Sequence, residues 1–124
     1  MAAIARLAAI SVDGPDPVSL SRFYCELLDL EVMFESADFV ALKGAGVLLT
    51  MQRVDSHRAP DWPDGDVSKQ MHLELAVSNL DEAESKAVAA GAVKADIQPA
   101  PDRWRVLLDP AGHPFCVTTL IPEV

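Results

Sequence analysis

Apolar positions along the chain recur with two different periods, and these periods predict the secondary structure. Residues 17–29 and 80–90 carry apolar side chains at about 3.6-residue spacing, which is typical of amphipathic helices. Shorter stretches with period-two alternation predict eight strands. These strands are expected near residues 4–12, 31–35, 38–43, 46–53, 71–77, 93–98, 103–109 and 114–120.

The ends of both predicted helices carry recognisable capping residues. Asp16 followed by Pro17 is typical of an N-cap and a first helical position. Asn79 or Ser78 is expected to cap the second helix, and Gly91 is expected to end it. The helix boundaries are therefore predicted from local chemistry as well as from periodicity.

The stretch 102–120 predicts a strand, a tight turn and a returning strand. Apolar and polar positions alternate through 103–109, and Asp109-Pro110-Ala111-Gly112 has the residues of a reverse turn. Cys116 lies in the returning strand, so its side chain must point to one face of the sheet or the other. Whether that face lines a cavity is the central functional question.

Residues 54–69 have no periodicity and contain two prolines, a glycine and four aspartates. This composition favours a linker or a lid. The chain of 124 residues is expected to form one domain, with module one at 1–53, the linker or lid at 54–69 and module two at 70–124.

The predicted order is strand, helix and three strands, and it occurs twice. Val12 and Val77 end corresponding first strands 65 positions apart, and the later turn glycines Gly46 and Gly112 lie 66 positions apart. An internal duplication explains both spacings. Two such units can cover each other's open faces, which predicts an α+β fold with a cupped, barrel-like mixed sheet around a cleft.

Composition narrows the classes of function. Half of the residues are apolar and 23% are charged, which is typical of a globular chain, and the formal net charge is −9. That charge disfavours nucleic acid and anionic membranes as partners, and it favours a cationic small molecule. No apolar run approaches the roughly 18 residues of a membrane span. Without a recognisable signal peptide and with two cysteines expected to be free thiols, the chain is predicted to be cytoplasmic.

Several short motifs follow one another in a specific order over nearly the whole chain. They are Val12-Asp13, Arg22-Phe23-Tyr24, Leu27-Leu28-Asp29-Leu30, Gln70-Met71-His72-Leu73 with Val77, Leu80-Asp81-Glu82-Ala83, and Leu108-Asp109-Pro110-Ala111-Gly112-His113-Pro114-Phe115. With these motifs the chain resembles the vicinal oxygen chelate superfamily of glyoxalase I, bleomycin-resistance proteins and extradiol dioxygenases. Ala59-Pro60-Asp61-Trp62-Pro63 and Asp102-Arg103-Trp104 are similar to its glyoxalase-like branch. The resemblance implies paired βαβββ modules, a cupped sheet and a homodimer.

The resemblance also implies four cavity positions, one on the first and one on the last strand of each module. It places His72 on the first strand of module two, and the repeat then places Leu7 on that of module one. It places Cys116 where metal-using relatives carry a glutamate, with Thr50 as its counterpart. The expected ring is therefore Leu7, Thr50, His72 and Cys116.

This ring predicts a poor metal site. A catalytic divalent ion needs at least three protein ligands, but Leu7 cannot ligate and Thr50 ligates badly. No cofactor is therefore predicted. Gln52 and Glu74 lie two residues from ring members on the same strand faces, so His72, Gln52 and Glu74 form the alternative metal set.

Each polar candidate also has a structural reading. His72 is either a cavity residue or a hydrogen-bonded strand histidine. Glu74 would act as a general base with His72 if burial raised its pKa, but an ion pair with an arginine is the favoured reading. The candidate partners are Arg6, Arg103 and Arg105.

Cys116 would be a nucleophile only if a neighbouring cation lowered its pKa, and a small buried side chain is the favoured reading. Trp104 alternates with core residues and is expected to be packed or to stack on a ligand. Trp62 lies in the polar loop, where contact with a ligand is the better explanation.

Two classes of function remain. The first is a protein that binds a small molecule in its cleft without a catalytic metal, through His72, Glu74 and the ligand-binding candidates. Those candidates are Thr50, Gln52, Trp62, Trp104 and Cys116. The second is a lyase, isomerase or dioxygenase of the same superfamily that uses His72 with Glu74 or Gln52.

Overall fold

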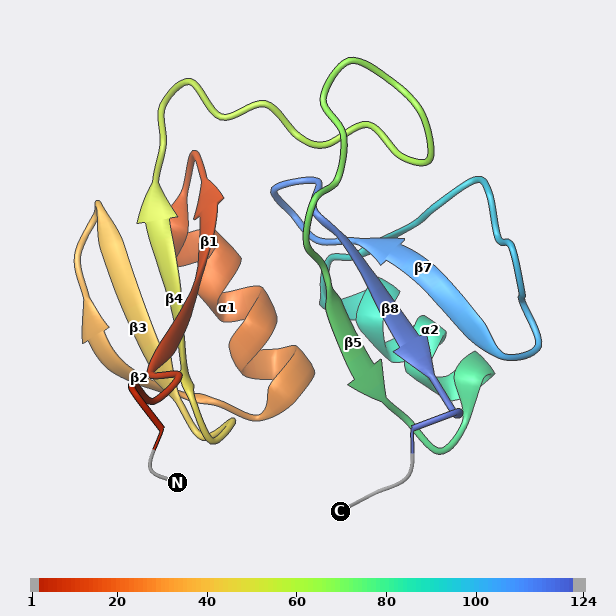
Figure 1. Cartoon of the computed structure of the whole chain (residues 1–124), viewed down its shortest axis with the longest axis horizontal. Helices are drawn as coiled ribbons and strands as arrows, with labels where there is room; N and C mark the ends of the chain where they lie inside the picture. The colour runs from red at the N-terminus through yellow and green to blue at the C-terminus, as the bar shows by residue number, and fades with distance from the viewer. Residues whose placement is uncertain (1–2, 122–124) are drawn as a thin grey trace. The chain divides into compact units, whose positions relative to one another are not determined.

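The computed structural model describes residues 3–121, and the chain divides into two compact units between His57 and Arg58 (Figure 1). Each unit consists of a strand, a helix and three further strands. Within residues 3–121, no helix has the length and the apolar character that crossing a membrane requires.

The first unit is a four-stranded mixed sheet with one helix. Its elements are β1 (Ala9–Gly14), α1 (Pro17–Leu28), β2 (Glu31–Glu35), β3 (Phe39–Lys43) and β4 (Leu48–Arg53). The strand order is β1-β4-β3-β2, in which β1 and β4 are parallel and the other pairs are antiparallel.

The sequence around α1 explains both its start and its packing. The Asp16 side chain accepts a hydrogen bond from the Ser19 N–H at 3.1 Å, which caps the helix as predicted. Leu20, Phe23 and Tyr24 are buried, and the two aromatic rings meet edge to face with centroids 5.0 Å apart. The core of this unit therefore lies between α1 and one face of its sheet.

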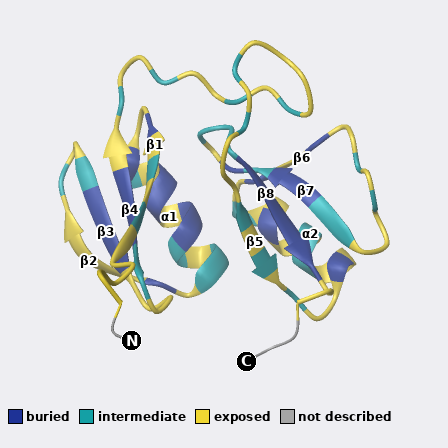
Figure 2. Cartoon of the chain, in the orientation of Figure 1, coloured by how far each residue is buried: buried dark blue, intermediate teal, exposed yellow. Residues whose placement is uncertain are grey.

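The second unit repeats this topology with different side chains. Its elements are β5 (Leu73–Ala76), α2 (Leu80–Ala90), β6 (Val93–Lys94), β7 (Trp104–Leu108) and β8 (Pro114–Thr118). The strand order is β5-β8-β7-β6, and β5 and β8 are parallel. All five residues of β8 are buried, whereas all five residues of β2 in the first unit are exposed (Figure 2).

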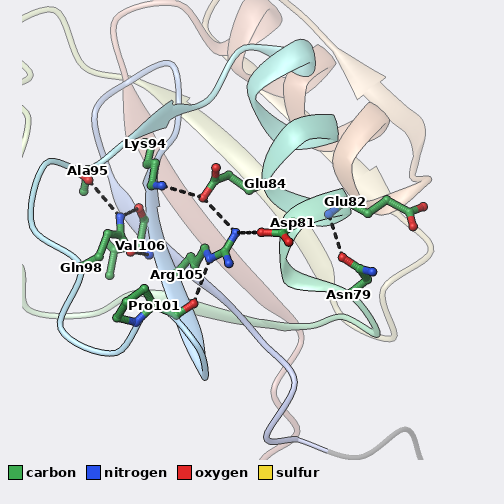
Figure 3. A network of polar contacts seen from close by, with 10 residues as sticks. All are labelled: Asn79, Asp81, Glu82, Glu84, Lys94, Ala95, Gln98, Pro101, Arg105 and Val106. Atoms are coloured by element: carbon green, nitrogen blue, oxygen red, sulfur yellow. Dashed lines mark hydrogen bonds and ion pairs between the residues drawn. The ribbon is translucent and has the colours of Figure 1, made fainter.

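Polar contacts fix α2 to one face of the second sheet (Figure 3). Arg105 on β7 donates to Asp81 at 2.6 Å and to Glu84 at 3.4 Å, and both carboxylates belong to α2. Lys94 on β6 pairs with the same Glu84 at 3.2 Å. Because side chains alternate along a strand, Trp104 and Val106 must point to the opposite, open face of this sheet.

Most predicted elements are confirmed, with differences at their ends. The first strand begins at Ala9 rather than at residue 4, and the strand predicted over 93–98 is limited to β6. Beyond β6, the Gln98 side chain donates to the Ala95 and Val106 carbonyl groups at 2.9 and 2.8 Å, and it accepts from the Val106 N–H. A side chain thus replaces part of the backbone pairing that a longer strand would make.

The repeat is present, but the predicted spacing of its first strands is wrong by two residues. The helix caps Asp16 and Asn79 lie 63 positions apart. Cross-strand pairing gives the same spacing. Ser11 pairs with Thr50 in the first unit, and Glu74 pairs with Cys116, the counterpart of Thr50, in the second. Ser11 and Glu74 therefore correspond, and they too lie 63 positions apart. The counterpart of His72 is therefore not Leu7, which lies outside β1 and is exposed.

Candidate functional site

The open face of the second sheet carries a row of three side chains from neighbouring strands. Glu74 on β5 pairs with Cys116 on β8, and Cys116 pairs with Val106 on β7. The next pair along β8 and β7 joins Thr118 to Trp104. Parallel pairing of β5 with β8 thus places a carboxylate directly beside the cysteine that sequence patterning left without an assigned face.

His72 lies just before β5 and completes a polar group with Glu74 and Cys116. Its Nε2 lies 2.5 Å from Oε1 of Glu74, and the two side chains are 29% and 44% exposed. Cys116 is only 6% exposed. One ligand atom from each of these residues lies within 4.8 Å of the others, so they offer nitrogen, oxygen and sulfur donors together.

The environment of Cys116 keeps its thiol protonated. Burial, reinforced by the negative charge of Glu74, raises the pKa of Cys116 to about 11, whereas Lys69 acts in the opposite direction. A nucleophilic cysteine needs a lowered pKa. The reading of Cys116 as a nucleophile is therefore contradicted. Its reading as a small buried side chain fits this environment, in which the thiol donates a hydrogen bond toward Glu74.

The favoured reading, an ion pair of Glu74 with Arg6, Arg103 or Arg105, is wrong, because the ion pair that Glu74 makes among the described residues is with His72. Arg105 points to the other face of the sheet, where it contacts Asp81 and Glu84. The contacts of Glu74 among the described residues are with His72 and Cys116. Glu74 is therefore positioned to accept hydrogen bonds at the open face instead of being neutralised by an arginine.

A hollow of about 280 Å³ opens beside this polar group. Its lining residues are Glu74, Trp104, Thr118, Leu120 and Ile121. A carboxylate and a hydroxyl thus border a surface that is otherwise aromatic and aliphatic. Apolar walls with few placed polar groups are typical of small-molecule sites.

Both tryptophans contact the core beneath this face. Trp62 and Trp104 are partly buried and pack against Ala95, Val106 and Cys116. The Lys69 ammonium lies 5.6 Å from the centroid of the Trp62 ring. Trp62 is therefore held within the second unit, and its predicted role in a lid stays a prediction.

Two predicted site residues belong to the first unit. Thr50 and Gln52 share one face of β4, opposite Leu49 and Met51, and Thr50 is buried. They pair across the parallel ladder with Ser11 and Asp13. Their participation in one site with His72 and Cys116 stays a prediction.

The sequence interpretation missed three residues of the hollow: Thr118, Leu120 and Ile121. Thr118 lies two positions after Cys116, so strand alternation already indicated that both share a face. Leu120 and Ile121 follow the end of β8, where no periodicity gives the direction of a side chain.

Comparison with known proteins identifies the family. A sequence model described as the glyoxalase-like domain matches residues 9–118. No match was found among curated proteins. Among solved structures, a glyoxalase/bleomycin resistance protein/dioxygenase family enzyme from Burkholderia phytofirmans PsJN is similar at 18% identity, with 94% of this chain and 100% of that chain covered and a TM-score of 0.73.

Two further structures have the same fold and narrower descriptions. The fosfomycin resistance protein FosX from Listeria monocytogenes is 16% identical, covers 94% of this chain and 93% of its own, and has a TM-score of 0.71. The bleomycin-binding protein from bleomycin-producing Streptomyces verticillus, in complex with copper(II)-bleomycin, is 16% identical, with 94% and 98% covered and a TM-score of 0.59. At these identities the likeness concerns the fold alone. The predicted resemblance is confirmed: the chain belongs to the glyoxalase-like domain family, and its α+β fold is that of the glyoxalase, bleomycin resistance and dioxygenase proteins.

Proposed function

We propose that this protein binds a small organic molecule in the hollow beside His72, Glu74 and Cys116, without a resident catalytic metal. The single observation that carries the proposal is a carboxylate at the edge of an apolar, tryptophan-lined hollow. Glu74 is 44% exposed there, so a ligand can reach it.

The lining residues define which chemistry the hollow would accept. Glu74 would accept a hydrogen bond from a hydroxyl or an ammonium group of the ligand. Trp104, Leu120 and Ile121 would contact an aromatic or aliphatic part. Since ligand pockets usually measure about 300–1,000 Å³, this hollow suits a small ligand or one end of a larger one.

Fold relatives support binding as a function for this architecture. One of them carries the description of a fosfomycin resistance protein, and another binds copper(II)-bleomycin. The net charge of −9 favours a neutral or cationic ligand over an anionic one, and it argues against nucleic acid and anionic membranes as partners.

We also infer that the protein forms a homodimer and that it is located in the cytoplasm. The dimer would be tested by light scattering during size-exclusion chromatography.

Three probes with one ring and different polar groups test the proposal: benzylamine, benzyl alcohol and benzoate. In a Trp62→Phe variant, Trp104 is the single tryptophan, because the chain has two. We expect benzylamine and benzyl alcohol to change Trp104 emission saturably and benzoate to do so at much higher concentration.

Glu74→Gln keeps the size of the side chain and removes its charge, so it should weaken benzylamine binding several-fold. Glu82→Gln is the matched control, because Glu82 lies on α2 and pairs with Lys86 at 2.7 Å. Equal weakening by both variants, or binding of all three probes alike, would contradict a site at Glu74.

A second candidate function is a metal-dependent lyase, isomerase or dioxygenase of the superfamily. The specific observation in its favour is the three-donor group of His72, Glu74 and Cys116. Imidazole, carboxylate and thiolate are all zinc ligands, and three protein ligands leave a position open for substrate. The predicted set has Gln52 as its third ligand, and Cys116 offers a further donor beside His72 and Glu74 within the second unit.

If an ion binds, it would supply Lewis-acid chemistry to a ligand oxygen. His72, Glu74 and Cys116 would hold the ion only after the Cys116 thiol lost its proton, and the raised pKa of this thiol opposes that loss. Without metal, the His72–Glu74 pair would hold and transfer a proton at the imidazole Nε2.

Elemental analysis of protein purified without chelator separates these functions. The metal-free proposal expects less than stoichiometric metal. Stoichiometric zinc, nickel, iron or manganese that is lost in His72→Ala would overturn it. Cobalt(II) titration gives a second readout, because a thiolate–cobalt absorption band that disappears in Cys116→Ser would assign the ion to this group.

A further inference from the structure

A second hollow, of about 460 Å³, lies in the second unit at the edge of the sheet formed by β6. Its apolar lining includes Trp62, Val93, Ile97 and Leu108, and its acidic lining consists of Asp61 and Asp96. None of the five residues that line the first hollow lines this one. Nothing in the proposed function uses this second hollow.

We propose that this second hollow binds a small organic cation. The charged group would lie near Asp61 and Asp96, and the apolar part would contact Trp62, Val93 and Ile97. A cation is favoured because carboxylates attract it. The Lys69 ammonium already lies 5.6 Å from the centroid of the Trp62 ring, so the indole is expected to contribute apolar contact to the ligand.

The loop over 61–68 is built around the Asp61 carboxylate. Oδ2 of Asp61 accepts a hydrogen bond from the Val67 N–H at 3.1 Å, and the Asp61 N–H donates to the Val67 carbonyl at 2.6 Å. Gly65 has φ +144°, and a Cβ at this position would lie 2.2 Å from Cβ of Asp61. Only glycine allows this close approach, so the loop holds the carboxylate in a fixed place beside Trp62.

The charges around the hollow do not cancel. Lys94 also lines it, but its ammonium pairs with Glu84 of α2 at 3.2 Å (Figure 3). That pairing offsets the positive charge of Lys94, and the other two charged lining residues, Asp61 and Asp96, are both acidic. Lys69 does not line the hollow, although its ammonium lies near the Trp62 ring. Charge complementarity therefore selects a cation over an anion at this place.

Exposed apolar side chains supply the rest of the site. Val93 is 60% exposed and Ile97 is 52% exposed, although both border a tryptophan that is already partly buried. A ligand with an aromatic or alkyl group would cover them and gain the free energy of that burial. The proposed occupant is thus an amine that carries an apolar group.

The two hollows lie toward opposite ends of β7. Trp104 at its start borders the first hollow, and Leu108 at its end borders the second. Four residues of strand span about 13 Å. Trp104 lines the first hollow and not the second, and Trp62 lines the second and not the first. Each tryptophan therefore reports on the hollow that it lines.

The experiment uses a Trp104→Phe variant, in which Trp62 is the single fluorophore. Benzylamine in its ammonium form should change Trp62 emission saturably, and benzyl alcohol should do so at least about fivefold more weakly. Asp61→Asn retains an oxygen that accepts from Val67 and removes only the charge. Asp61→Asn and Asp96→Asn should each raise the Kd about threefold to fivefold.

Asp66→Asn is the matched control, because Asp66 is exposed on the same loop and does not line the hollow. The proposal is overturned if Asp66→Asn weakens binding as much as Asp61→Asn, if benzyl alcohol binds as well as benzylamine, or if Trp62 does not respond. If circular dichroism shows that Trp104→Phe does not fold, the wild-type chain labelled with nitrogen-15 can be used instead. The NMR signal of the Trp62 indole N–H then reports binding at the second hollow. The Trp104 signal reports the first hollow separately, so failure of one proposal is distinguishable from failure of the other.

Discussion

Ser11 and Thr50 lie side by side on β1 and β4, and the second unit has Glu74 and Cys116 at the same two places of its own sheet. The counterpart of His72 at the same spacing is Ala9. The backbone ladders match, yet one unit has two hydroxyls and a methyl group where the other has an imidazole, a carboxylate and a thiol. The topology is therefore shared by both units, whereas this polar group belongs to the second one.

The shared part is the packing between helix and sheet, and breaking it should have the largest effect. Phe115 on β8 is 1% exposed and points into the core of the second unit. Phe115→Ala should lower the free energy of unfolding by about 3–5 kcal/mol, because the lost burial leaves a cavity. Urea denaturation followed by circular dichroism measures this loss.

Phe34 on β2 provides the control, because this side chain is exposed in the first unit. Phe34→Ala should cost under about 1 kcal/mol. Equal losses for the two substitutions would show that β8 is not the buried strand that the structure describes.

The helix caps test whether the two units are equivalent in local chemistry. Asp16 accepts from the Ser19 N–H at 3.1 Å, and Asn79 accepts from the Glu82 N–H at 2.9 Å. Asp16→Ala and Asn79→Ala should each cost about 1 kcal/mol of unfolding free energy. Ser78→Ala should cost little, because the cap is Asn79. A larger loss for Ser78→Ala would reverse that assignment.

Local patterns predicted the fold well for a physical reason. Periodicity, caps and turn residues act over a few positions, so Asp16, Asn79 and the turn before Pro114 could be recognised in the sequence. Cross-strand register depends on contacts that are distant in sequence. For this reason the first-strand spacing was misjudged by two residues, and Leu7 was assigned in place of Ala9.

The candidate site was predicted in part. His72, Glu74 and Cys116 were selected from a resemblance and from strand alternation, and the structure brings these three together. Their mutual contacts were not predicted, because the pairing of Glu74 with Cys116 follows from the parallel ladder of β5 and β8. Leu120 and Ile121 follow the last strand, where no repeating pattern applies.

The thiol of Cys116 gives the second unit a pH dependence that its counterpart Thr50 cannot give the first, because Thr50 has no titrating group. The pKa of Cys116, about 11, lies above the ordinary value of 9.0 in the unfolded chain. The folded state thus retains a proton that the unfolded state loses, so stability should fall as pH rises from about 9 to about 11. Cys116→Ser should remove this part of the pH dependence in thermal denaturation. Cys25→Ser should remove a smaller part, because burial and the charge of Glu35 raise the pKa of Cys25 less strongly.

Glu74→Gln should lower the pKa of Cys116, since the negative charge of Glu74 helps to raise it. The pKa should stay above the ordinary value, because burial is the larger cause. Thiolate absorbance against pH in a Cys25→Ser background measures the shift. An unchanged titration would mean that the carboxylate does not reach the sulfur.

The smallest expected effect comes from Lys69, which acts on the same thiol with the opposite sign. Its ammonium lowers the pKa of Cys116 and lies 5.6 Å from the Trp62 ring centroid. Lys69→Met keeps an unbranched side chain and removes the charge, so the pKa of Cys116 should rise slightly while Trp62 emission changes. Lys86→Met on α2 is the control, because Lys86 pairs with Glu82 on the helix. If both substitutions shift the thiol equally, the effect belongs to the net charge of the chain and not to the position of Lys69.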